Sequence, residues 1–335
     1  MTKQEVMGMG KRNLWELSAI ASVSVMLAAC GGGGDSRDGT GKLSVSITDA
    51  PIHEAQSVTV NFLGAEVKPA SGPVLKFNFC EDPDDPDKNP PIVQDTECTD
   101  SDPHVESIDL LQQTGGASAL LLDDVDIPAG KVNWVRLVLA DPAGEIVLST
   151  GTFPLTVPSG SQTGLKLNRG FDVPDEGEAQ VFIDFDVRKS IVEVHSTVPP
   201  SYKLKPTLRM VEEFGAIAGE VSATLMVTQC LGGSIYVFSG AGTTPDDIDR
   251  DKGDPVSSTL VISDAGSSTG YSYHADFLEP GDYTVAFVCA SGVSQDGGAT
   301  FDEPADDPDE DDELSFTVAS NTAMVVDDQT VQINF

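Results

Sequence analysis

Alternating carboxylates mark the part of the sequence best suited to bind a metal ion. Asp247, Asp249 and Asp251 precede Gly253. Carboxylate oxygens that converge in a loop are the ligands that Ca²⁺ prefers. Counted from Asp247, however, glycine is the seventh residue instead of the sixth, and Ser258 stands where an EF-hand has glutamate. The alternatives are therefore a calcium site of another kind and a solvated acidic loop.

A second candidate is an aromatic residue with a cation beside it. Along residues 132–140 one face of the expected strand is apolar, whereas Trp134 and Arg136 share the other face. An exposed aromatic ring can stack against a sugar, and a neighbouring cation can hold a partner. In the alternative interpretation, the tryptophan packs under a loop or against a neighbouring domain. The pair is our candidate ligand-binding site.

Signals of catalysis are poor, and we expect no enzymatic activity. Residues 266–270 have Gly-x-Ser-x-Gly spacing, but a nucleophile elbow needs a helix after the serine, and residues 271–277 have the pattern of a strand. The histidines lack metal-ligand spacing; they are His53, His104, His195 and His274.

Four cysteines follow Cys30 in the sequence. They are Cys80, Cys98, Cys230 and Cys289. An even number of cysteines in an exported chain favours disulfides, and three pairings are possible. Proximity in sequence and the domain division given below favour Cys80 with Cys98 and Cys230 with Cys289.

The N-terminus predicts export. Basic residues precede an apolar segment, residues 19–29, which is too short to span a bilayer. Leu27-Ala28-Ala29-Cys30 resembles the lipobox of bacterial lipoproteins, which implies a signal peptide over residues 1–29, a lipid on Cys30 and anchoring in the membrane. The alternative is an ordinary signal peptide with an incidental cysteine. By the same resemblance, Gly31 lacks the aspartate of inner-membrane retention, so we expect the outer membrane. Residues 30–40 predict a flexible tether.

The composition limits the partners. Across 335 residues the formal net charge is -35, so we expect neither nucleic acid nor anionic membrane surfaces as direct partners. A neutral or basic ligand, or divalent cations, suit such a body. Hydrophobic residues make up 39% of the chain, which excludes a disordered acidic protein.

Period-two alternation recurs along the chain and predicts an all-β fold. Val45 and Ile47 alternate with polar residues, and many short strands separated by glycine and proline follow. This pattern indicates antiparallel β-sandwiches. We expect two in tandem, over residues 41–212 and 216–335, joined by a short linker.

Four motifs in the first expected domain resemble a known family. Residues 41–51, 158–167, 184–192 and 202–206 resemble, in order, motifs of the bacterial and archaeal domain-of-unknown-function family numbered 4382. The resemblance spans about residues 41–211. It implies no settled activity, and members are commonly exported and lipid-anchored.

The second expected domain carries one such motif. Residues 278–285, Leu-Glu-Pro-Gly-Asp-Tyr-Thr-Val, resemble a turn of transthyretin-like and carboxypeptidase-regulatory-like modules. The resemblance implies a seven-stranded sandwich of the carbohydrate-binding-like fold over residues 216–335.

These observations predict a lipid-anchored protein of the cell envelope that acts as a non-catalytic binding or adhesive module. Its expected partner is a carbohydrate or another extracellular polymer. The alternative is a structural spacer, or a subunit of a surface assembly without a small ligand. A hydrolase is the third class, and it lacks a catalytic constellation.

Overall fold

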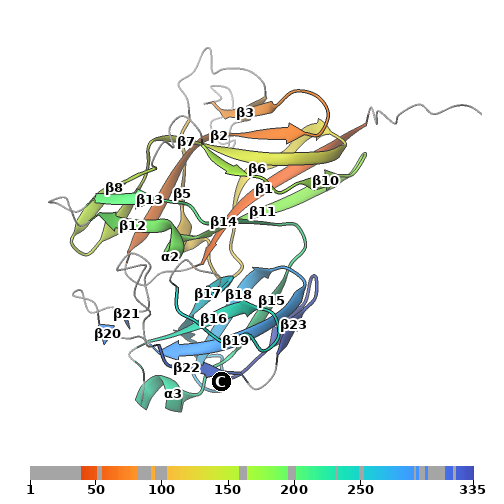
Figure 1. Ribbon diagram of the computed structural model, residues 1–335. Coiled ribbons are helices and arrows are strands. Elements are labelled where there is room, and N and C mark those ends of the chain that lie inside the picture. Colours follow the sequence, from red (N-terminus) through yellow and green to blue (C-terminus); the bar gives the residue numbers. More distant parts are fainter. Residues whose placement is uncertain are drawn as a thin grey trace, which may run out of the picture. The chain divides into compact units, whose positions relative to one another are not determined.

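The fold is all-β, as the alternation predicts (Figure 1). The computed structural model describes residues 39–50, 55–80, 92–94, 104–157, 164–194, 201–228, 230, 232–248, 253–289, 292–293, 299–300, 314–319 and 322–335. All of them belong to one compact unit, Arg37–Phe335. None of the helices within these ranges has the length and apolar character needed to cross a bilayer.

A four-stranded sheet contains the first strand of the fold. Its spatial order is β14 (Leu208–Val211), β11 (Glu178–Asp186), β1 (Thr40–Ala50) and β6 (Ala119–Pro128). Val45 and Ile47 are fully buried on β1, but Ser44, Ser46 and Thr48 between and beside them are buried as well, so the strand is covered on both faces and not on one. Strands β1 and β11 pair in parallel, contrary to the purely antiparallel prediction. Alternation indicates that a segment is a strand but carries no information on strand direction.

A second sheet has ten strands. In spatial order the main path is β12 (Ile191–Val194), β13 (Ser201–Leu204), β8 (Gly151–Thr156), β7 (Gly130–Leu148), β2 (Ser57–Pro69), β3 (Leu75–Phe79) and β4 (Ile92–Gln94). Strands β9 (Leu165–Leu167) and β10 (Phe171–Val173) pair with β7, and β5 (Glu106–Asp109) pairs with β2. Buried side chains of this sheet and of the four-stranded sheet form one hydrophobic core.

A third sheet has eight strands, and a hairpin stands apart from it. The main path is β22 (Phe316–Val318), β19 (Gly281–Cys289), β16 (Gly233–Ser239), β17 (Ser257–Ser263), β18 (Tyr271–Leu278), β15 (Gly215–Glu220) and β24 (Thr330–Gln332), with β23 (Ala323–Val325) on β19. Strands β20 (Gly292–Val293) and β21 (Ala299–Thr300) pair with each other.

Strand β16 is buried on both faces. Ile235 and Val237 enter one hydrophobic cluster, and Tyr236 and Phe238 enter another on the opposite face. A strand covered on both sides reads as a continuous apolar run, which is the pattern of residues 235–238. Met210 is the last residue of one hydrophobic cluster and Ile217 the first of another, and the domain boundary between them stays a prediction. Two sandwiches in tandem remain our interpretation of this arrangement.

Several predicted elements differ from those observed. The strand expected over residues 132–140 is part of a longer one, β7, which continues to Leu148. The segment that resembles the last family motif, residues 202–206, begins in β13, and β14 follows it in a different sheet. Three short helical turns occur that the hydrophobic periodicity of the sequence does not predict. They are η1 (Leu110–Gln112), α2 (Val187–Ser190) and α3 (Ala223–Thr228). A turn of three to six residues is too short to display a helical period.

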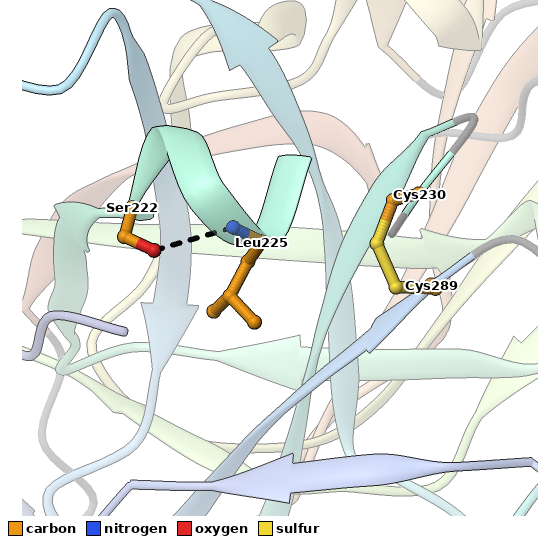
Figure 2. Close-up of a disulfide and its surroundings, with 4 residues drawn as sticks. All are labelled: Ser222, Leu225, Cys230 and Cys289. Atoms are coloured by element: carbon orange, nitrogen blue, oxygen red, sulfur yellow. Dashed lines mark hydrogen bonds between the residues drawn. A yellow bond between two sulfur atoms is a disulfide. The ribbon is translucent and has the colours of Figure 1, made fainter. Parts of the chain in front are cut away.

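One disulfide closes the third sheet (Figure 2). Cys230 follows α3 and is bonded to Cys289 at the end of β19, with the Cα atoms 5.1 Å apart. The Ser222 hydroxyl oxygen accepts a hydrogen bond from the Leu225 amide at the start of α3. Cys80 is also disulfide-bonded, and its predicted partner Cys98 lies outside the described residues.

Candidate functional site

A β-bulge in β2 places polar side chains on the face of the ten-stranded sheet that points away from the core. The register of β2 against β7 shifts between Phe62 and Gly64. After the bulge Glu66 and Lys68 point outward, whereas Val67 is buried. A Cβ atom at position 64 would lie 2.2 Å from the Phe77 carbonyl oxygen of β3, which is too close for any side chain. Glycine therefore allows β2 and β3 to approach each other at the bulge, after which Glu66 and Lys68 point outward.

The strand register aligns charged residues of four strands. Glu66 of β2 is paired with Lys76 of β3 and with Arg136 of β7, and Arg136 is paired with Lys166 of β9. In the next row Lys68 lies opposite Trp134. We call the set the Trp134 patch: Glu66, Lys68, Lys76, Trp134, Arg136 and Lys166. Its described residues comprise four cations and one carboxylate, a balance opposite to that of the acidic chain as a whole.

Two cations of the patch lie against the tryptophan ring. The guanidinium carbon of Arg136 is 5.0 Å from the ring centroid, and the Lys166 ammonium nitrogen is 4.5 Å from it. Arg136 also donates from Nη1 to Glu66 Oε2 at 2.8 Å. Within the described ranges Lys166 has no ion-pair partner. The Trp134 ring, which we considered as a surface for stacking a sugar, therefore already lies against two cations, Arg136 and Lys166, each attracted by the aromatic quadrupole.

A groove adjoins the patch through Lys166. Its volume is about 600 Å³, and it lies between β9 and β14. Lys166, Arg169 and Arg209 line it together with Leu165, Leu208 and Met210. Arg209 is hydrogen-bonded to Asp184 at 2.6 Å, and Arg169 pairs with Glu279. The patch and the groove together form the candidate binding site.

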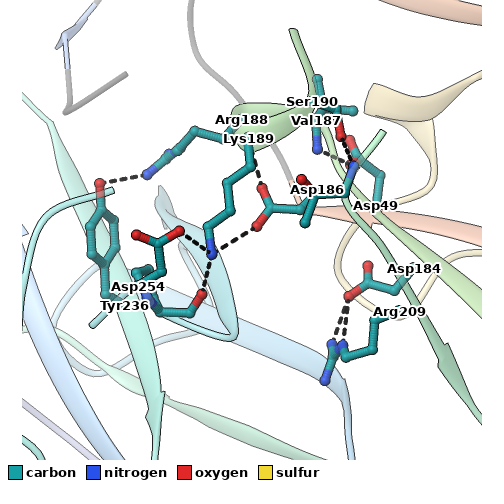
Figure 3. A network of polar contacts seen from close by, with 12 residues as sticks. Asp49, Asp184, Asp186, Val187, Arg188, Lys189, Ser190, Arg209, Tyr236 and Asp254 are labelled. Atoms are coloured by element: carbon teal, nitrogen blue, oxygen red, sulfur yellow. Dashed lines mark hydrogen bonds and ion pairs between the residues drawn. The ribbon is translucent and has the colours of Figure 1, made fainter. Parts of the chain in front are cut away.

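A buried polar network surrounds α2 (Figure 3). Asp49 Oδ1 accepts a hydrogen bond from the Val187 amide at 3.1 Å, and Asp186 Oδ1 accepts one from the Lys189 amide at 3.1 Å. Burial raises the pKa of Asp184, and the Arg209 guanidinium opposes that shift. Asp49 belongs to the family-like motif of residues 41–51, and Asp184, Asp186 and Lys189 belong to that of residues 184–192. The two motifs therefore lie against each other in space, and their hydrogen bonds stabilise the α2 turn.

The same network reaches the acidic loop for which calcium is predicted. Lys189 Nζ lies 3.1 Å from an Asp254 carboxylate oxygen and donates to the Pro255 carbonyl oxygen at 2.6 Å. Asp247 is buried, with 4% of its surface exposed, and Asp249 and Asp251 lie outside the described residues. No metal-ligating cluster occurs in the part of the chain that the structure describes. Calcium binding stays a prediction.

The Gly-x-Ser-x-Gly stretch is a turn between β17 and β18. Ser267 Oγ donates to the Tyr271 carbonyl oxygen at 3.1 Å, and Ser268 is bonded to Glu220. A histidine–carboxylate pair lies on β18, where His274 Nδ1 is 2.5 Å from Asp276 Oδ2. This hydrogen bond raises the pKa of His274. Over the described ranges no serine hydroxyl is hydrogen-bonded to His274, so the pair lacks the nucleophile of a triad.

Sequence reasoning found Trp134 and Arg136 but missed the other members of the patch. Alternation along β7 placed those two residues on one face, as observed. Lys68, Lys76 and Lys166 join them only through pairing with β2, β3 and β9. The polar positions of alternating strands were the available signal, but they did not reveal which strands are neighbours.

Comparison with known proteins agrees with the family resemblance over its predicted span. Residues 40–206 match the model of a domain of unknown function, DUF4382. No curated protein matches the chain. The likeness of residues 216–335 to transthyretin-like modules stays a prediction.

Some solved structures are faintly similar. The minor pilin GBS52 of Streptococcus agalactiae is 13% identical, with 87% of this chain and 94% of that chain covered and a TM-score of 0.18. The major pilin subunit BcpA of Bacillus cereus is 10% identical, with 88% and 98% covered and a TM-score of 0.18. The shaft pilin SpaA of Lactobacillus rhamnosus GG is 10% identical, with 88% and 98% covered and a TM-score of 0.18. At these TM-scores the likenesses carry no weight for function.

Proposed function

We propose that this protein is a non-catalytic binding module of the cell envelope that holds an extracellular polysaccharide at the Trp134 patch. The observation that carries the proposal is the patch itself: an aromatic side chain and cations on an outward sheet face, beside a groove of about 600 Å³. Concave, partly apolar surfaces with a few polar groups are typical of ligand sites. A single weak contact would gain strength from many copies on one cell.

Binding to insoluble polysaccharides and to isolated envelope material tests this function. The wild-type protein should sediment with at least one of these materials, and Trp134→Ala should sediment less. If neither protein binds any polymer, the proposed function is wrong.

Attachment to the membrane is part of the proposal. Leu27-Ala28-Ala29-Cys30 supports cleavage before Cys30 and lipidation of its thiol, with delivery to the outer membrane. Each buried methylene of the acyl chains contributes about 0.8 kcal/mol, so several chains hold firmly. Mass spectrometry of the mature N-terminus should find the lipid, and an unmodified Cys30 would contradict this anchor.

A second candidate function is a subunit of a surface assembly. Strand β22 ends the main path of the eight-stranded sheet, and apolar side chains near it are exposed, namely Val318 at 47% and Met324 at 64%. A strand edge of this kind can pair with another chain. Sedimentation of the purified protein distinguishes the two functions, since an assembly subunit should form concentration-dependent polymers that Met324→Lys weakens.

A further inference from the structure

The Trp134 patch has a charge opposite to that of the whole chain. Lysine and arginine number only 19 in the sequence, against 54 acidic residues. Lys68, Lys76, Arg136 and Lys166 gather here, and among the described residues one carboxylate, Glu66, belongs to the patch. Within a row, neighbouring strands are about 4.8 Å apart, so Lys76 and Lys166 are separated by about 14 Å. A surface this small and this positive is suited to a ligand with negative groups at intervals.

The geometry of the ring explains why these charges are held in place. Arg136 lies between the Glu66 carboxylate, 2.8 Å away, and the Trp134 ring, 5.0 Å away. Lys166 lies 4.5 Å from the same ring and is exposed to solvent. Both cations are therefore positioned by attraction to the ring rather than by neutralising carboxylates alone. A sugar stacked on the ring would have to share it with them.

We propose that the Trp134 patch binds an anionic polysaccharide, whose carboxylate or sulfate groups pair with Lys166, Arg136 and Lys68. Trp134 acts as a positioning residue that holds the two cations, and the sugar does not stack on its ring. This inference rests on the proposed function and names its ligand class. It reverses the expectation of a neutral or basic ligand, because net charge describes the whole molecule and the patch is local.

The charge of the rest of the protein does not prevent such binding. At physiological ionic strength charges are screened beyond about 8 Å, so an anionic group in contact with Lys166 experiences chiefly the patch. A nucleic acid fits less well, because its phosphates are closely spaced and most of its affinity comes from many phosphate contacts. Four cations on an acidic body offer few such contacts, whereas a polysaccharide with one charge per sugar or fewer needs only a few.

The test uses the mature full-length protein in detergent on surfaces that carry polygalacturonate, neutral pullulan or single-stranded DNA. Polygalacturonate should bind most strongly, and binding should weaken as NaCl is raised. Lys166→Gln should weaken it by up to about fivefold, the upper end for one exposed ion pair. The double variant Lys68→Gln and Lys166→Gln should weaken it more than Lys166→Gln alone.

Lys42→Gln is the matched control. Lys42 is exposed, lies in the four-stranded sheet and pairs with Asp126 at 2.9 Å. Lys42→Gln changes the net charge as much as Lys166→Gln does. Because Lys42 lies outside the Trp134 patch, the control should leave polygalacturonate binding unchanged. Equal losses in the two variants would overturn the patch as the site.

Trp134 is tested by a signal that a purely structural role would not give. Trp15 is the only other tryptophan and lies in the predicted signal peptide, so indole fluorescence of the mature protein reports Trp134. Polygalacturonate should change this fluorescence by drawing Lys166 from the ring, and Lys166→Gln should abolish the change. Trp134→Phe keeps a weaker aromatic platform and should lie between wild type and Trp134→Ala in affinity.

The outcomes separate the ligand class from the function. Equal binding to pullulan and polygalacturonate, with Lys166→Gln unaffected, would overturn the anionic ligand and leave polysaccharide binding intact. Binding to neither polysaccharide would overturn the anionic ligand, and a failure to sediment with any polymer would overturn the proposed function as well. Preferential binding to single-stranded DNA that Lys166→Gln removes would confirm a cationic site but overturn the polysaccharide as its ligand.

Discussion

Arg188 Nη1 donates a hydrogen bond of 2.8 Å to the hydroxyl of Tyr236. Both residues are buried, with 1% and 0% of their surfaces exposed, and they come from α2 and from β16. The Arg188 guanidinium carbon also lies 5.3 Å from the Tyr236 ring centroid. A buried guanidinium needs acceptors because transfer out of water is costly. The contact therefore ties the family-like segment to the third sheet.

Removing the hydroxyl of Tyr236 should destabilise the protein. Tyr236→Phe keeps the ring beside Arg188 but takes away one acceptor of a buried donor, which costs about 1–3 kcal/mol of unfolding free energy. Urea unfolding measures the difference. Tyr271→Phe is the control, because within the described ranges the hydroxyl of Tyr271 makes no hydrogen bond, and it should change little. Equal stability of both variants and wild type would refute the assigned role of the contact.

Asp49 should be required for the conformation of α2. Its Oδ1 atom accepts from the Val187 amide at 3.1 Å, and the residue is 6% exposed. Asp49→Ala leaves that amide without its acceptor and should lower the free energy of unfolding by about 1–3 kcal/mol. Asp49→Asn retains an oxygen acceptor and should lose less. A larger loss in the asparagine variant would mean that the charge of Asp49 matters more than this hydrogen bond.

The Cys230–Cys289 disulfide should contribute substantially to stability. It closes a loop with a sequence separation of 59 residues. The chain-entropy model gives about 4 kcal/mol for a loop of this length. Cys230→Ala with Cys289→Ala should lose that amount in urea unfolding without reductant. Treating wild type with reductant is a poorer test, since Cys80 is disulfide-bonded as well.

His274 should make stability decrease with rising pH. Its hydrogen bond to the Asp276 carboxylate raises its pKa, against the effect of burial. A raised folded-state pKa means that the protonated form is favoured by folding. The contribution is complete below the ordinary histidine pKa of about 6.5 and is lost as pH rises through the folded value. Its size is modest, because 43% of the His274 side chain is exposed.

Melting temperatures between pH 6 and pH 9 test this dependence. Between these pH values the melting temperature of the wild type should decrease more than that of His274→Gln, which has no titrating ring at this position. His104→Gln is a control, because His104 is likewise paired with a carboxylate, that of Glu106 at 3.3 Å, but precedes β5 in a different part of the fold. Identical pH profiles of wild type and His274→Gln would exclude the contribution of His274.

The sequence alone predicted the features that depend on neighbouring residues in the chain. The alternation of Val45 and Ile47 with polar residues identified a strand and the all-β class, although the polar residues of this strand are buried as well. The same logic put Trp134 and Arg136 on one face, because successive side chains of a strand point to opposite sides. The motifs of residues 41–51 and 184–192 identified the family-like domain without indicating that the two segments touch.

Only the tertiary structure decided which strands are neighbours. Glu66 and Arg136 are 70 positions apart, and nothing in either segment specifies their pairing. The parallel pairing of β1 with β11 and the close approach of Lys166 to Trp134 likewise depend on long-range register. Register is selected by burial of the whole core and by bulges such as that at Gly64, which are collective properties. The charge pattern of the binding face is therefore set by the packed sheet and not by any one segment.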